Sequence, residues 1–334
     1  MTALDHAAIP APRPGKARRG GASLPPALRR KRRRDGLTAL GFLSPWLIGF
    51  CVFFGYPLIA SVYFSFYDYN EFNPPTYTGL ANWDYVLFHF PDLVAGLENT
   101  LWLVVVMVGL QIVFGVGVAL LITKIKRGGG FFRTLFYLPY LAPPVISTLV
   151  FVYLFTSGGT VDTLLADIGI HNPPGWFNSP AWFKPSLTLL SMWGIGNTVI
   201  IFLAALLDVP REQLEAAAID GAGPIKRFRY VTLPTIQPVV LFCAVTGVIY
   251  TMQYYTQAII AQEVAQGQSV TAGTTATIGY PGNSSITVPQ LVYQEGFIQQ
   301  NVGPACCLSI ILFVMTMAFT MILLRRKSGL TTED

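Results

Sequence analysis

Charged side chains are scarce in this sequence of 334 residues. Asp, Glu, Lys and Arg together make up 12% of the chain, about half of the share that soluble domains usually carry. Hydrophobic residues account for 52%, and the mean hydropathy is +0.51. This combination argues against a soluble globular domain and indicates a membrane protein.

Motifs that carry enzyme chemistry are also missing. The glycines at 128–130 are followed by Phe131-Phe132-Arg133 rather than by Lys and Ser or Thr, so they do not form a phosphate-binding loop. No spacing typical of a catalytic triad or a metal site occurs among the histidines and cysteines, which are His6, His89, His171, Cys51, Cys243, Cys306 and Cys307. We therefore predict that the chain is not an enzyme, and that it has no catalytic residue and no metal or cofactor of its own.

Long apolar segments are what the sequence has instead, and six of them contain no Asp, Glu, Lys or Arg. A helix needs about 20 apolar residues to cross the hydrocarbon core of a membrane. The segments that qualify are 37–66, 99–123, 134–157, 185–207, 239–261 and 303–324. The predicted fold class is therefore an all-α integral membrane protein with about six transmembrane helices. We expect the third segment to be kinked, because it contains Pro139, Pro143 and Pro144.

The two ends of the chain differ from this transmembrane domain, which we expect at 35–327. Residues 1–34 are rich in Pro, Ala, Gly and Arg and end in a basic run at 29–34. We expect a disordered cytoplasmic arm, and not a nucleic-acid-binding segment, because an apolar span follows the basic run at once. Residues 328–334 are expected to form a short cytoplasmic tail.

The distribution of Lys and Arg predicts the orientation in the membrane. If there are six spans, all but one of the 22 basic residues fall on one side, in the arm, in 124–133, in 208–238 and after residue 324. The exception is Lys184. Cytoplasmic loops carry the excess of positive charge, so we expect a multi-pass protein of the cytoplasmic membrane with both termini in the cytoplasm.

The lack of charge inside the spans bears on the energy source. Proton- and sodium-coupled carriers usually keep an ionisable residue within the membrane, and these spans have none as drawn. We therefore expect a separate ATPase, bound at a cytoplasmic loop, to supply the energy. An ion-coupled secondary carrier and a structural or sensory membrane protein remain as alternatives.

The longest cytoplasmic connection, 208–238, is predicted to form two short helices. Pro210 suits the start of the first helix and Pro224 the start of the second. Gly221 can end the first helix, and Pro234 is expected to end the second. One face of the first helix, at positions i, i+3, i+4 and i+7, is almost free of bulk and would let another protein approach closely; it comprises Leu214, Ala217, Ala218 and Gly221. From the residues alone, a hairpin that merely caps the bundle remains equally open.

This connection resembles the EAA loop of bacterial ABC importer permeases. The resemblance rests on Glu-Ala-Ala, then Gly, then Leu-Pro, and it involves Glu215, Ala216, Ala217, Asp220, Gly221, Ala222, Phe228, Leu233 and Pro234. It implies a type I ABC importer permease fold in which these residues couple to a cytoplasmic ABC ATPase dimer. It also implies that ATP and magnesium are used by that ATPase, and that a second related permease and an extracytoplasmic solute-binding protein complete the assembly.

Other stretches resemble the first permease type of the carbohydrate branch, which is related to the maltose system. They are Leu43 to Phe50 with Tyr56-Pro57, Ser65 to Asn70, Gly79 to Trp83, and Phe131 to Pro139. The likeness covers about residues 37–325 and implies a sugar or oligosaccharide as substrate. It departs at 262–288, where this chain has a longer stretch rich in Gly, Ser and Thr.

Uncharged polar and aromatic residues in spans four and five are candidates for the substrate path. Rings suit the apolar face of a sugar, and amides and hydroxyls suit its OH groups. The candidates are Trp193, Asn197, Tyr250, Gln253, Tyr254 and Gln257. Hydrogen bonding between helices is the simpler interpretation of each residue taken singly. Glycerol phosphate or another polyol-like solute is an alternative substrate, although a phosphate would require a cation that no span supplies.

Overall fold

The structure is a computed structural model that describes residues 26–125, 127–267 and 278–328. The chain divides into two units, Met1–Leu58 and Ile59–Asp334, which are described separately. Within the first unit, helix α1 (Pro26–Phe50) continues through a π-type turn, η1 (Cys51–Gly55), into the start of α2 (Tyr56–Phe64). We expected residues 26–34 to be disordered, but they belong to α1. Arg and Lys are good helix formers, so they extend the apolar helix that follows. Residues 1–25 and 329–334 lie outside the described part.

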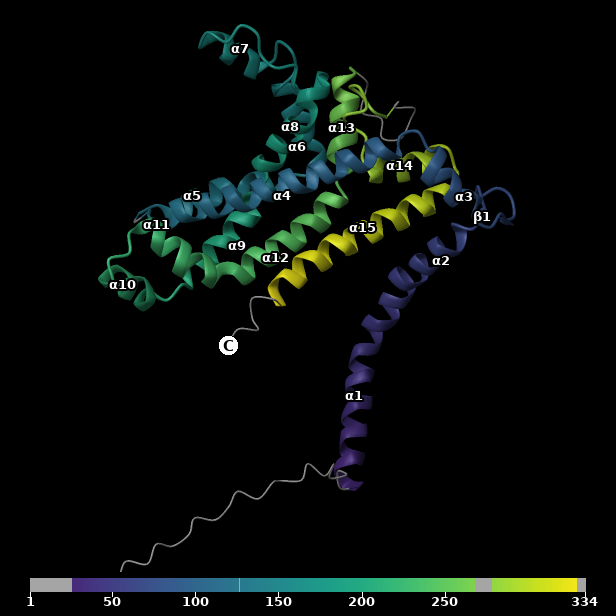
Figure 1. Ribbon diagram of the computed structural model, residues 1–334, viewed down its shortest axis with the longest axis horizontal. Helices are drawn as coiled ribbons and strands as arrows, with labels where there is room; N and C mark the ends of the chain where they lie inside the picture. The colour runs from purple at the N-terminus through teal and green to yellow at the C-terminus, as the bar shows by residue number, and fades with distance from the viewer. Residues whose placement is uncertain (1–25, 126, 268–277, 329–334) are drawn as a thin grey trace, which may run out of the picture. The chain divides into compact units, whose positions relative to one another are not determined.

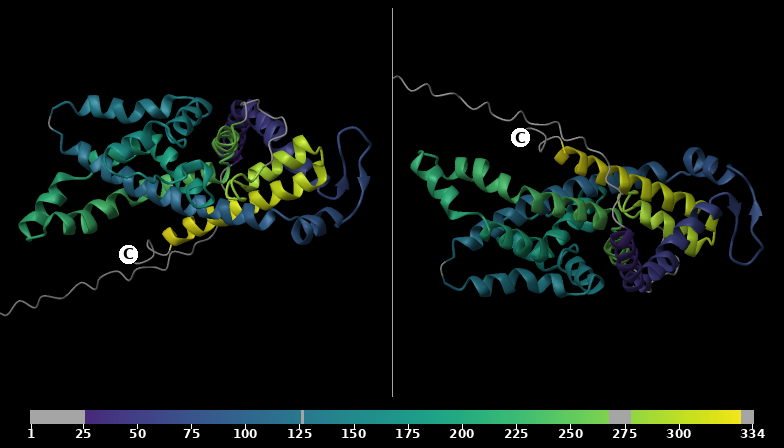
Figure 2. Two further views of the ribbon diagram at one scale, coloured as in Figure 1. Left: turned by 90° about the horizontal axis from the view of Figure 1, so that it is seen from above. Right: turned by 90° about the horizontal axis from the view of Figure 1, so that it is seen from below.

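The second unit is helical apart from one short antiparallel hairpin, in which Tyr67 pairs with Tyr77. Its elements are β1 (Tyr67–Asp68), β2 (Thr76–Tyr77), α3 (Ala81–Asp84), η2 (Tyr85–His89), α4 (Leu93–Thr123), α5 (Gly129–Tyr137), η3 (Leu138–Leu141), α6 (Pro144–Leu154), α7 (Thr160–Asp167), η4 (Trp176–Asn178), α8 (Pro180–Trp193), α9 (Gly196–Leu207), α10 (Arg211–Ile219), α11 (Pro224–Arg227), η5 (Phe228–Thr232), α12 (Leu233–Met252), α13 (Thr256–Ala265), α14 (Val288–Tyr293), η6 (Gln294–Ile298) and α15 (Val302–Ser328). The hairpin and α10 lie at opposite ends of this unit (Figures 1 and 2).

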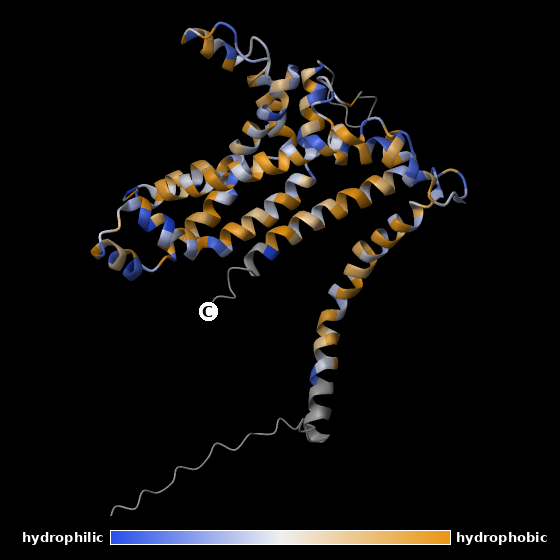
Figure 3. Cartoon of the chain, viewed as in Figure 1, coloured by the Kyte–Doolittle hydropathy of each residue, from blue (hydrophilic) through white to orange (hydrophobic). Residues whose placement is uncertain are grey.

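Length and apolar composition give four helices that can cross a membrane. They are Asp35–Phe64, Leu93–Thr123, Pro224–Met252 and Val302–Arg325, and two further helix pairs qualify only as bent spans. The described part of the chain thus holds four to six spans, which agrees with the expected all-α membrane fold. Figure 3 shows that hydrophobic residues predominate along α12 and α15, whereas hydrophilic residues gather on α10.

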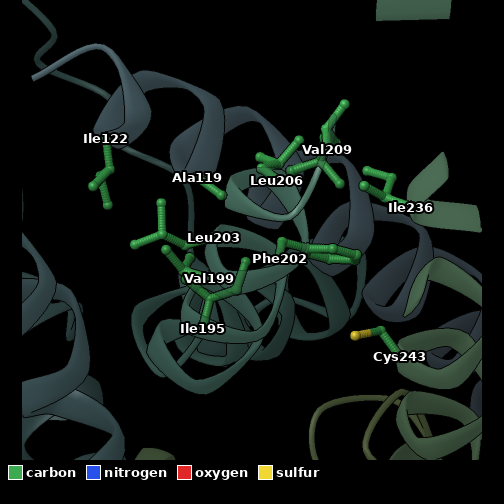
Figure 4. Packing of buried hydrophobic residues seen from close by; sticks show 11 residues of the cluster. Ala119, Ile122, Ile195, Val199, Phe202, Leu203, Leu206, Val209, Ile236 and Cys243 are labelled. Carbon is green, nitrogen blue, oxygen red and sulfur yellow. The ribbon is translucent and has the colours of Figure 1, made fainter. Parts of the chain in front are cut away.

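The core nearest to the α10 end forms where α4, α9 and α12 meet. Phe202 of α9 is fully buried there and packs with Ala119 of α4 and Ile236 of α12 (Figure 4). Gly115 of α4 makes room for this ring, because an added Cβ would lie 3.0 Å from Phe202 Cδ2. Close packing of this kind fixes the three helices relative to one another.

The third and fourth spans are both broken. Gly129–Leu141 and Pro144–Leu154 meet at 98°, which confirms the kink expected from the prolines, and Pro180–Trp193 and Gly196–Leu207 meet at 54°. The fourth span starts before the predicted residue 185, so Lys184 lies within α8. Gly196 starts α9 against the end of α5: a Cβ there would overlap Phe136 O and lie 2.7 Å from Tyr137 Cα. Only glycine permits this approach of the two broken spans.

The prediction that Pro234 ends a helix was wrong, and the fifth span is displaced. Residues Pro224–Met252 form one continuous span, which stops at 253–255 before α13 begins. Pro234 is tolerated because it follows the π-type turn η5, where Leu233 N–H donates to Phe228 O. A wide turn of this kind absorbs the missing proline donor without ending the helix.

Candidate translocation cavity and coupling loop

A cavity of about 460 Å³ lies where the third, fourth and fifth spans are interrupted. This volume is within the range of about 300–1,000 Å³ that is usual for small-molecule sites. Its walls come from α4, from the η3–α6 break, from the α8–α9 break and from the α12–α13 break; they include Gln111, Tyr140, Ser147, Ser191, Trp193, Asn197, Thr198, Thr246, Tyr250, Gln253, Tyr254 and Gln257. Non-helical backbone at membrane depth is tolerated where it lines a cavity, and discontinuous helices commonly form transporter binding sites.

All six predicted substrate-path residues lie on this one cavity. Tyr250 is 76% exposed and Trp193 is 59% exposed, so a large part of each residue is accessible. Gln253 and Tyr254 occupy the break between α12 and α13, where Gln253 N–H donates to Tyr250 O at 3.2 Å. Sequence reasoning found these residue types but did not predict the break that gathers them.

The walls are polar but carry no charge. None of the residues on the cavity is an Asp, Glu, Lys, Arg or His. The hydroxyl of Tyr254 is buried and makes no hydrogen bond within the described residues. The Tyr254 ring packs against the buried cluster that contains Phe151 and Phe183, so the hydroxyl is enclosed by protein rather than open to the cavity.

Among the described residues, no group of three or more His, Cys, Asp or Glu side chains could hold a metal ion. Cys243 lies on the cavity alone, without a second ligand-type side chain beside it there. The chemistry that this arrangement offers is therefore neutral hydrogen bonding and ring stacking.

The predicted loop at 208–238 forms a helix, a tight reversal and a second helical segment. Helix α10 follows Pro210, which is in extended conformation, and the loop reverses at Gly221, whose φ is +79°. Ala222 N–H donates to Ala217 O at 2.9 Å, and Gly221 N–H donates to Ala218 O at 3.1 Å. These two bonds form the Schellman motif that commonly ends a helix, and Pro224 then opens α11 as expected.

The loop has an inner and an outer side. Leu214 and Phe228 pack on the core around Phe202, and Ala217 is half-buried. The expected bare face is therefore partly turned toward the chain itself. Glu215, Ala216, Asp220, Gly221 and Pro234 are exposed, whereas Ala222 is half-buried.

Two isoleucines that the sequence analysis missed dominate the outer side of the loop. Ile219 is 87% exposed and Ile225 is 82% exposed, while Leu233 at the start of α12 is 38% exposed. The sequence predicted an apolar seam of Ile225, Phe228 and Val231 on the second helix, but Ile225 is exposed while Phe228 and Val231 are half-buried. Exposed apolar side chains in a hydrophilic loop are typical of a contact surface.

Comparison with known proteins identifies the family. A sequence profile for "Binding-protein-dependent transport system inner membrane component" matches residues 111–327. The chain belongs to this family. The matched region contains the loop at 208–238 and every cavity residue except Met107.

Similar curated proteins extend the likeness over most of the chain. This chain is 30% identical over 297 residues to the "Probable ABC transporter permease protein YesP" of Bacillus subtilis, and the match covers 89% of this chain and 92% of that protein. It is 30% identical over 284 residues to the "sn-glycerol-3-phosphate transport system permease protein UgpA" of Yersinia enterocolitica, covering 84% and 90%. It is 31% identical over 259 residues to the "Lactose transport system permease protein LacF" of Rhizobium radiobacter, covering 77% and 82%.

A solved structure shows the same fold. A chain of a bacterial ABC transporter involved in the import of the acidic polysaccharide alginate superposes with a TM-score of 0.73 at 21% identity, covering 92% of this chain and 100% of that chain. The type I ABC importer permease fold implied by the EAA-like loop is thereby confirmed.

Proposed function

We propose that this chain is a transmembrane permease subunit of an ATP-driven importer and that it carries an uncharged sugar or oligosaccharide through the cavity at the three broken spans. The observation that carries the proposal is the lining of this cavity. It combines aromatic rings, amides and hydroxyls without any charged side chain. A sugar offers apolar ring faces and OH groups, which match this lining.

The partners follow from the two ends of the second unit. At the α10 end, Glu215, Ala216, Ile219 and Ile225 offer an exposed surface to a cytoplasmic ATPase dimer. ATP and magnesium would be bound there, by the ATPase and not by this chain. A second related permease would complete the pathway, and an extracytoplasmic solute-binding protein would deliver the sugar at the opposite end.

The orientation rests on charge. Lys226 and Arg227 lie in α11 and Arg229 lies in η5, and the basic arm and tail fall on the same side of a six-span chain. The excess of Lys and Arg marks the cytoplasmic side. We therefore place both termini in the cytoplasm and the protein in the cytoplasmic membrane.

Uptake into proteoliposomes that contain the complete transporter tests the proposal. We expect accumulation of a neutral saccharide only with internal ATP and with the solute-binding protein, and we expect it to persist when an ionophore abolishes the proton and sodium gradients. Loss of uptake with the ionophore while ATP is present would establish an ion-coupled carrier. Uptake of glycerol phosphate but of no neutral saccharide would overturn the substrate class, because the described cavity offers no cation.

A further inference from the structure

Side chains of α4 and α13 hold residues 278–288 in place, at the end of the second unit away from α10 (Figure 1). Asn99 of α4 donates from Nδ2 to Asn283 O at 2.8 Å and to Ile286 O at 3.0 Å. Gln262 of α13 accepts at Oε1 from Gly279 N–H at 3.2 Å and from the Ser285 hydroxyl at 2.7 Å. Polar side chains thus replace the secondary structure that this segment lacks.

Apolar packing reinforces these bonds. Ile286 and Leu291 are each only 1% exposed, and both pack against the start of α4. Gly96 of α4 makes the close approach possible, since an added Cβ would lie 2.8 Å from Leu291 Cδ1. Val288, the last residue of the segment, donates its N–H to the hydroxyl of Thr100 at 3.0 Å.

Lys184 orients the Asn99 amide. Its ammonium donates to Asn99 Oδ1 at 2.9 Å and lies 5.3 Å from the centre of the Trp102 ring. A lysine can only donate, so it fixes the oxygen of the amide toward α8 and leaves both Nδ2 hydrogens for the carbonyls of the segment. Lys184, which has no role in the cavity lining, thereby acts on residues 278–288 through Asn99.

The segment also touches the cavity wall. The hydroxyl of Thr287 donates to Tyr254 O at 3.5 Å, and Tyr254 lines the cavity in the break after α12. The segment is therefore linked to the cavity wall at the backbone of Tyr254.

We propose that Asn99, oriented by Lys184, is a clasp that holds residues 278–288 against α4 and α13, next to the cavity wall at Tyr254, and releases them when solute enters. The inference rests on the proposed function, because it assigns the clasp to the outward-opening step of transport. Asn99 and Lys184 are positioning residues in this step: they touch the segment or each other and not the solute. Replacing Asn99 by Leu removes both hydrogen bonds to the segment, one buried and one partly buried, which shifts the balance between held and released segment by about tenfold.

The first test measures ATP hydrolysis by the reconstituted complete transporter without solute-binding protein. We expect Asn99→Leu to raise this basal hydrolysis about tenfold, Lys184→Met to raise it less, and Lys184→Arg to restore the wild-type rate because Arg still donates. Asn178→Leu is the matched control, since the only bond of the Asn178 amide to the segment is an exposed 3.4 Å contact from the Tyr280 hydroxyl. Equal basal rates in all of these variants, alongside normal wild-type uptake, would overturn the clasp and leave the proposed function standing.

The second test reads the position of the segment itself. Ser285 is 1% exposed, so Ser285→Cys, in a chain whose exposed Cys51 is replaced by Ser, should resist a membrane-impermeant thiol reagent at rest and react during turnover. Adding Asn99→Leu, or Lys184→Met if the former does not assemble, should make it reactive at rest. Protection of this cysteine in every state would show that the segment is fixed, and would overturn the inference. Absence of wild-type uptake under all conditions would instead count against the proposed function.

Discussion

Tyr254 lines the proposed cavity but encloses its hydroxyl in the protein, so a solute reaches that hydroxyl only if the cavity wall moves. Its buried hydroxyl has no partner within the described residues, so Tyr254→Phe leaves no internal group unsatisfied. We expect normal expression and thermal stability, and an apparent KM for sugar uptake raised about three- to tenfold, which corresponds to the loss of one hydrogen bond. Tyr153→Phe, at a ring that is 66% exposed and away from the cavity lining, should leave KM unchanged. An unchanged KM in the Tyr254 variant would show that this hydroxyl does not meet the solute.

Glu295 predicts a pH effect on stability. It is 2% exposed, and burial raises the pKa of its carboxyl, an effect that the hydrogen bond from Asn301 partly opposes. A raised pKa means that the folded chain holds this proton more tightly than the unfolded chain does. Stability therefore falls as pH rises from the usual carboxyl range toward the raised pKa, and is level above it.

Glu295→Gln removes this decline and keeps the acceptor for Asn301. The melting temperature in detergent should exceed that of the wild type by a margin that widens from about pH 4 upward, and that reaches about 2–4 °C if the gain is about 1 kcal/mol. A margin that stays constant across this range would refute the assignment to Glu295.

The loop at 208–238 has an exposed surface that we propose binds the ATPase. Ile219 and Ile225 stand outside the core, so Ile219→Asp should leave the fold intact and weaken binding of the ATPase about tenfold, as an interface hot spot does. Retention of the ATPase on the purified complex and uptake should fall together. Ile168→Asp is the matched control, because Ile168 is 74% exposed beyond the end of α7. Full ATPase retention with Ile219→Asp would mean that this surface is a passive cap.

The contact between the broken third and fourth spans depends on a single glycine. Gly196→Ala would place a methyl group against the backbone of Phe136 and Tyr137, so we expect a loss of about 1–3 kcal/mol in stability or more. Gly194→Ala meets only Ser191 O at 3.8 Å and should be tolerated. Thermal unfolding of the two variants in detergent decides the matter: equal melting temperatures would show that α5 can move away from α9.

At the scale of the whole molecule, the orientation in the membrane is open to a direct measurement. Gln299, which is exposed after η6, should react as Gln299→Cys with an impermeant thiol reagent added to intact cells, in a background where Cys51 is Ser. Glu212→Cys, on exposed α10, should react only after lysis. The reverse pattern would invert the topology. Ser284 is unsuitable for this measurement, because it is buried and its hydroxyl donates to Pro281 O at 2.7 Å.

The sequence by itself determined the fold class, the turn in the loop at 208–238 and the types of residue on the cavity. Long uncharged runs can exist only as membrane helices, so the fold class followed from composition and spacing. The reversal at Gly221 and the start of α11 at Pro224 followed from the backbone preferences of glycine and proline. The types of residue on the cavity were also visible, since uncharged polar side chains within spans are few.

Only the tertiary structure decided where the spans are broken and which side of its helix each residue presents to the rest of the protein. The helix continues through Pro234 because the preceding π-type turn absorbs the missing donor, a feature that no local pattern announces. The hydrogen bonds from Asn99 to the carbonyls of residues 283 and 286 join positions 184 and 187 apart in the chain. Helical periodicity describes neighbours within a few turns, whereas such contacts are fixed by the packing of whole helices, and that packing gathers Trp193, Asn197 and Tyr254 on one cavity.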